Sequence, residues 1–134
     1  MADTGALYAL AESADVWHAR VVDWWSAAPR DVAVPVTVVP EVTYLLGRRL
    51  GAEAEEAFVR ALARGELRVE ELADADWSRV ADLMVAYADL PLGFVDASIV
   101  AMAERLEVTE VLTTDRKHFG VVRPRHVERL TLLP

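Results

Sequence analysis

The chain has 134 residues, of which 54% are hydrophobic, enough for one compact domain that takes in residues 1–134. Its net charge of -8, from 22 acidic and 14 basic residues, argues against broad affinity for duplex DNA, which depends on neutralising phosphates. The chain has no cysteine, no signal peptide and no apolar run of the roughly 20 residues that span a bilayer. We therefore expect a cytoplasmic protein without disulfides, thiolate zinc sites or membrane contact.

Short β-rich runs alternate with longer helical periods, which predicts an α/β fold with a central, mainly parallel sheet covered by helices. In chain order, we expect helices at 5–12, 17–27, 40–46, 52–64, 76–87 and 95–106, and strands at 32–36, 67–72, 111–113 and 130–133. Pro40 suits the first turn of its helix, and Gly47 suits a stop. Only Met1 and Ala2 precede Asp3, so either the first strand is unusually short or the recorded start lies downstream of the natural one.

The sequence also predicts the surroundings of several apolar and basic side chains. A core face of the helix at 95–106 is indicated by helical spacing of Ile99, Met102, Ala103 and Leu106. Few bases interleave with the tryptophans, which favours packing or an interface over a base-stacking platform for Trp17, Trp24, Trp25 and Trp77. Either phosphate contacts or ordinary surface ion pairs are expected of Arg48, Arg49, Arg116, Lys117, Arg123 and Arg125.

Four acids far apart in the sequence lie where an apolar run ends or a helix begins: Asp3, Glu41, Asp96 and Asp115. Each alone also fits a helix cap or a turn. Ligands of parallel α/β folds bind beyond the carboxyl ends of the strands, so together these carboxylates are expected to meet at one edge of the sheet. Oxygen ligands without Cys or clustered His suit Mg²⁺ or Mn²⁺. The pattern therefore predicts metal-assisted phosphodiester hydrolysis.

The motifs around these acids resemble those of the PIN-domain ribonucleases, especially the VapC-type toxins of bacterial toxin–antitoxin modules. Asp3 opens DTGALYAL, Glu41 lies in PEVTYLL, Asp96 lies in FVDASIVAMAERL and Asp115 lies in TTDRKHF. The resemblance covers nearly the whole chain and implies a PIN-like three-layer α/β/α domain with an acidic pocket.

The same resemblance implies a metal-dependent endoribonuclease with an RNA substrate, a cognate antitoxin and a homodimeric state. Asp3, Asp96 and Asp115 are expected to hold one or two Mg²⁺ or Mn²⁺ ions, directly or through water. Glu41 is expected to bind metal or to orient the attacking water, which the metal activates.

Further residues have expected roles beside the four acids. Thr4 and Thr114 are expected to assist by hydrogen bonding. Many family members carry another acid where this chain has His118, which either binds metal or phosphate or packs in a turn. The segment WHARVVDWW and the stretch at 45–46 either form an apolar binding surface or belong to the core.

Other functions remain open at this level. A housekeeping PIN nuclease that processes RNA and a non-catalytic PIN-like binding module both share the same motifs. A phospho-acceptor receiver domain is disfavoured, because Asp3 has no acidic neighbour and Lys117 follows Asp115 in the wrong setting.

Overall fold

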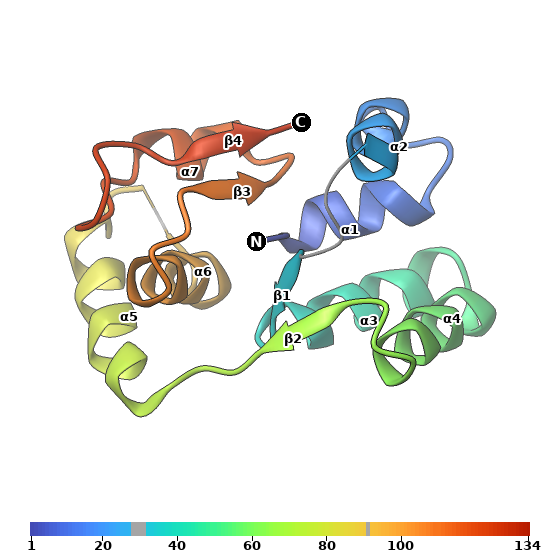
Figure 1. Cartoon of the computed structure of the whole chain (residues 1–134), viewed down its shortest axis with the longest axis horizontal. Helices are drawn as coiled ribbons and strands as arrows, with labels where there is room; N and C mark the ends of the chain where they lie inside the picture. Colours follow the sequence, from blue (N-terminus) through green and yellow to red (C-terminus); the bar gives the residue numbers. More distant parts are fainter. Residues whose placement is uncertain (28–31, 91) are drawn as a thin grey trace.

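The computed structural model describes residues 1–27, 32–90 and 92–134. Its strands are short and parallel. β1 (Ala33–Pro35) pairs with β2 (Arg68–Glu70), and β3 (Glu110–Leu112) pairs with β4 (Thr131–Leu133). Figure 1 shows the N-terminus between these two pairs. The predicted parallel sheet is therefore present, and each predicted strand has a counterpart in it.

The first residues of the chain join the two strand pairs into one sheet. Ala2 forms a parallel bridge with Leu112, and its amide donates to the carbonyl of Ala33 at 2.9 Å. The amide of Asp3 donates to the carbonyl of Leu112 at 3.0 Å. The N-terminal segment thus lies between β1 and β3, where it takes the place of a strand. It is long enough to place Asp3 at the carboxyl edge of the sheet.

Helices cover the sheet on both sides. In the described residues they are α1 (Thr4–Ala11), α2 (His18–Ala27), α3 (Val38–Arg49), α4 (Ala52–Ala63), α5 (Asp74–Ala86), α6 (Phe94–Arg105) and α7 (Arg116–Val121). In Figure 1, α5 and α6 lie on one side of the molecule, and α1, α3 and α4 lie on the other. All six predicted helices are present, and α7 is an additional one. None of the helices in the described residues is both long and apolar enough to cross a membrane.

The predicted helix stop at Gly47 is wrong. α3 continues through Gly47 to Arg49, and the chain leaves the helix at Gly51, whose φ is 96°. A Cβ on Gly47 would collide with the carboxylate of Glu55 on α4. Gly47 therefore leaves room for the carboxylate of Glu55, while Gly51 supplies the positive φ at which the chain leaves α3.

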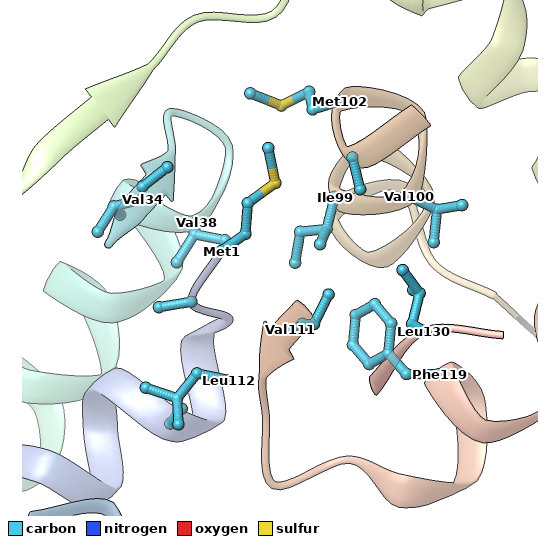
Figure 2. Packing of buried hydrophobic residues seen from close by; sticks show 14 of the residues in the cluster. Met1, Val34, Val38, Ile99, Val100, Met102, Val111, Leu112, Phe119 and Leu130 are labelled. Atoms are coloured by element: carbon cyan, nitrogen blue, oxygen red, sulfur yellow. The ribbon is translucent and has the colours of Figure 1, made fainter. Parts of the chain in front are cut away.

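A single buried cluster ties the helices to the sheet. Figure 2 shows the side chain of Met1 extending toward Met102 of α6, with Val34 on one side and Ile99 on the other. Complete burial of a side chain such as Ile99 stabilises the fold by about 2 kcal/mol. The predicted core face of α6 is confirmed by the burial of Ile99, Met102 and Ala103 and by the packing of Leu106 against the cluster.

The tryptophans pack, as predicted, but not all in the same way. Trp17, Trp24 and Trp25 lie partly buried against the core. Trp77 is 54% exposed and stacks on Phe94, with ring centroids 5.9 Å apart. Trp77 and Phe94 therefore form an aromatic surface that the fold itself leaves open.

Candidate active site

Asp3 is a buried carboxylate at the carboxyl edge of the sheet, and it also caps α1. One oxygen, Oδ1, accepts the amide of Ala6 at 2.8 Å, and the other accepts the hydroxyl of Thr113. Burial raises the pKa of Asp3 to about 6; the bonds from Thr113 and Ala6 oppose this rise, while the charges of Asp96 and Asp115 add to it. The capping alternative is therefore true of Asp3, but it does not account for a buried acid that faces two others.

Asp96 is a partly buried carboxylate in the first turn of α6. The N-cap of that helix is Gly93, and the Asp96 side chain has no hydrogen bond to the described residues. Burial raises its pKa to about 6, as do the charges of Asp115 and Glu41, against an opposing effect of His118. Because Asp96 forms no capping bond, the helix-cap explanation does not hold for it.

Asp115 follows β3 and begins α7, a helix that the sequence did not predict. Its Oδ1 accepts the amides of Lys117 and His118, each at 2.9 Å, and its Oδ2 lies 2.5 Å from Nδ1 of His118. Partial burial acts to raise the pKa of Asp115, but these bonds from His118 and Lys117 outweigh it and hold the pKa below its usual range. Asp115 therefore stays ionised beside acids whose pKa values are raised.

Thr113 connects two of the acids, whereas the hydrogen bonding near Asp115 was predicted for its neighbour Thr114. Its buried hydroxyl accepts the amide of Asp115 at 2.8 Å, so its own proton is directed to Asp3. The side chain of Thr114 makes no hydrogen bond within the described residues and lies where a Cβ on Gly5 would collide with it. The sequence offered a weak signal for Thr113, which is a polar residue at the end of a predicted strand.

Glu41 lies at the margin of this group. It is exposed, and it accepts the hydroxyl of Thr4 at 2.7 Å, the assistance predicted for Thr4. The compact part of the site consists of Asp96, Asp115 and His118, whose ligand-capable atoms all lie within 4.8 Å of one another. The structure thus brings Asp96 and Asp115 together with Asp3 beside them, and it places Glu41 at the rim.

The ligand-capable side-chain atoms at this edge of the sheet fit a divalent cation. Two oxygens on opposite sides of a Mg²⁺ ion lie about 4.2 Å apart, so small side-chain rotations bring ligands separated by 4.8 Å onto one ion. The arginines with the most buried ion pairs bind acids elsewhere, Glu104 and Asp76. Grouped carboxylates repel one another unless a cation or protons offset the charge, and a divalent ion supplies that charge locally.

The basic residues predicted to contact phosphate have mixed surroundings. Arg116 donates to the carbonyl of Leu132 at 2.9 Å and lies over the ring of Trp17 at 5.5 Å. Arg49 lies over the ring of Tyr8 at 5.6 Å. Exposed positions are occupied by Arg48, Lys117, Arg123 and Arg125. Phosphate binding by these residues stays a prediction.

The parallel sheet, its helices and the acidic edge are those of a PIN domain. A family model described as PIN domain matches residues 1–123, and the chain belongs to that family. It is 34% identical over 132 residues to Ribonuclease VapC26 of Mycobacterium tuberculosis, with 98% of each chain covered. The predicted PIN family is therefore confirmed, and the chain is similar to a ribonuclease of the VapC type.

A solved structure supports the fold independently. The crystal structure of Mycobacterium tuberculosis VapC20, a sarcin-ricin loop cleaving toxin, superposes with a TM-score of 0.84 at 23% identity. The match covers 94% of this chain and 96% of that one. The predicted α/β PIN fold is confirmed by this match.

Proposed function

We propose that residues 1–134 form one PIN domain that hydrolyses RNA phosphodiester bonds in the cytoplasm with Mg²⁺ or Mn²⁺, as the toxin of a toxin–antitoxin pair. The observation that supports the proposal most strongly is the environment of the Asp96 carboxylate. Its carboxylate is partly buried, has no hydrogen bond to the described residues and lies among other acids. Such a group is poorly satisfied by the protein alone and is completed by a cation.

Each residue of the site would have a different role in hydrolysis. When bound, the cation lowers the pKa of a water molecule and stabilises charge on the phosphate and the leaving oxygen. Asp3, Asp96 and Asp115 hold it, directly or through water. Thr113 keeps the Asp3 carboxylate in place through its hydroxyl bond. Glu41 stands exposed at the rim, where it accepts the hydroxyl of Thr4, and it would bind the cation or orient the attacking water.

A cognate antitoxin is the expected protein partner. An apolar cavity of about 430 Å³ opens among α1, α2, α3 and α4, with Leu7, Trp25, Leu46 and Phe58 in its walls. Trp25 and Leu46 come from the two segments that the sequence left between binding surface and core, and both line this cavity. An apolar stretch of the antitoxin would fill it. The similarity to Ribonuclease VapC26 favours this toxin role over housekeeping RNA processing.

The homodimer is proposed to use a second apolar surface. Trp77 is 54% exposed and stacks on Phe94 beside a cavity of about 460 Å³ that Pro40 also lines. Exposed aromatic side chains in one patch are typical of a protein interface. Light scattering of Trp77→Glu should report a monomer where the unaltered chain reports a dimer, and equal masses would contradict this surface.

The nuclease proposal is tested by comparing the purified chain with Asp96→Asn on RNA. Cleavage should require Mg²⁺ or Mn²⁺, stop with a chelator and fall by about 100-fold or more in the variant. Asp89→Asn is the matched control, because Asp89 is an exposed acid for which no contact with the site is found. Equal cleavage by Asp96→Asn, or cleavage that a chelator leaves unchanged, would contradict the proposal.

A further inference from the structure

The residue of the site that departs most from an all-carboxylate pocket is His118. It lies in α7, one helical turn after Asp115, and its side chain is 21% exposed. Its ligand-capable nitrogen falls within 4.8 Å of carboxylate oxygens of both Asp96 and Asp115. This chain therefore brings an imidazole nitrogen into a group whose other ligand-capable atoms are carboxylate oxygens.

Asp115 contacts both the backbone and the ring of His118, and the ring contact orients the imidazole. The amide of His118 donates to Oδ1 of Asp115 at 2.9 Å, and Nδ1 of its ring contacts Oδ2 of the same carboxylate at 2.5 Å. Nε2 has no hydrogen bond to the described residues. Metal-binding histidines commonly donate their second ring N–H to a carboxylate or a carbonyl, and Asp115, which also faces the cation site, is placed to accept the Nδ1–H of His118.

A packing role explains His118 less well. A histidine that only fills a turn would be expected to bond a backbone carbonyl, as His18 does with the carbonyl of Ala9 and His126 does with that of Val108, both at 2.8 Å. His118 is the ring that bonds a carboxylate of the site instead. The three histidines therefore divide into two that bond the backbone and one that faces the acidic group.

We propose that His118 contributes a ring nitrogen to the cation bound by Asp96 and Asp115, and that this nitrogen makes the site prefer Mn²⁺ to Mg²⁺. The inference rests on the proposed function, because it concerns the same cation. Imidazole suits transition metals, whereas Mg²⁺ favours oxygen ligands. A site made of carboxylates alone would bind Mn²⁺ and Mg²⁺ with more similar affinities.

Pulsed EPR of the Mn²⁺-loaded chain tests nitrogen ligation without measuring activity. The spectrum of the unaltered chain should show the modulation of a directly bound nitrogen. That modulation should be lost in His118→Gln and in His118→Asp, which restores an acid, and should remain in the matched control His18→Gln. Mn²⁺ bound without any nitrogen modulation would overturn the inference, and so would modulation that survives in both His118 variants.

Calorimetric titrations with Mn²⁺ and Mg²⁺ measure the preference itself. His118→Asp should weaken Mn²⁺ binding by about 10-fold while leaving Mg²⁺ binding equal or tighter. The same loss of affinity for both ions would overturn the claimed preference. Mn²⁺ that binds the unaltered chain, is lost in Asp96→Asn and shows no nitrogen modulation would overturn the His118 assignment alone. Failure of the unaltered chain to bind either ion would overturn the proposed function as well.

Discussion

Two groups of buried charges in this protein differ in what neutralises them. Between α5 and α6, Arg79 donates two hydrogen bonds to Glu104, both 2.8 Å long, and the two side chains are 16% and 9% exposed. At the carboxyl edge of the sheet, no arginine or lysine of the described residues pairs with Asp96, and Asp3 faces other acids. In the part of the chain that the structure describes, the first group is paired, whereas the second carries negative charge that only His118 opposes at Asp96.

The pKa values of Glu104 and Asp96 differ in the same way. Burial acts to raise the pKa of Glu104, but the bonds from Arg79 and from the amide of Arg125 outweigh it and lower the pKa. Burial raises the pKa of Asp96 to about 6, and no Arg or Lys offsets it. A paired carboxylate therefore stabilises the fold near neutral pH, and the unpaired one opposes it unless a cation is bound.

Breaking the paired group should have the largest effect on stability. Arg79→Leu leaves Glu104 buried without its guanidinium, so the free energy of unfolding should fall by about 3 kcal/mol. Replacing both residues by Leu should lose less, because no unpaired charge remains. Urea unfolding of the two variants measures this, and a double variant less stable than the single one would contradict the role given to the pair.

Removing one hydrogen bond within the acidic group should have a smaller effect. Thr113→Val keeps the size of the side chain but removes the donor to Asp3 and the acceptor for the amide of Asp115. We expect a loss of about 1–2 kcal/mol in the free energy of unfolding and a fall in RNA cleavage of about 10-fold. Thr131→Val, at an exposed position of β4, is the control. Unchanged cleavage by Thr113→Val would show that Asp3 needs no such support.

Neutralising the unpaired acid should stabilise the protein, the opposite of what happens in the paired group. In metal-free protein near neutral pH, Asp96→Asn should raise the free energy of unfolding by about 1 kcal/mol, a value reduced for solvent screening because Asp96 is only partly buried. Asp89→Asn should change nothing. Urea unfolding in the presence of a chelator measures both, and a destabilised Asp96→Asn would mean that the carboxylate has a partner in the metal-free protein.

The pH dependence of stability should be the smallest of these effects. Asp3 and Asp96 have pKa values raised from 3.8 to about 6, so the metal-free folded state binds protons more readily than the unfolded state over that range. Their contribution therefore becomes less favourable as the pH rises through about 6. Thermal unfolding in a chelator should show a smaller decline with pH for Asp96→Asn than for the unaltered chain. Equal pH profiles would contradict the raised pKa of Asp96.

Much of the fold followed from local patterns in the sequence. Apolar periodicity located each of the longer helices, and the core face of α6 followed from the spacing of Ile99 and Met102. Gly47 was misread because a glycine near a helix end also serves where two helices approach closely, and only the position of Glu55 distinguishes the two cases. Helix α7 was missed because six residues are too short for a clear helical period.

The site could be predicted in its acids but not in their environment. The motifs indicated Asp3, Glu41, Asp96 and Asp115, and the structure gathers three of them and leaves Glu41 at the rim. The sequence predicted hydrogen bonding by Thr114, but the direction of the chain after β3 turns the hydroxyl of Thr113 to Asp3. That no arginine or lysine of the described residues pairs with Asp96 is a property of three-dimensional packing, so no sequence motif indicates it.

Calorimetric titration with Mg²⁺ tests most directly whether the acidic group is completed by a cation. The unaltered chain and Asp89→Asn should bind the ion, and Asp96→Asn should show little or no binding under the same conditions. The folded state of each variant is checked by circular dichroism beforehand. Mg²⁺ binding by Asp96→Asn equal to that of the unaltered chain would contradict the account, because the cation would then lie elsewhere in the molecule.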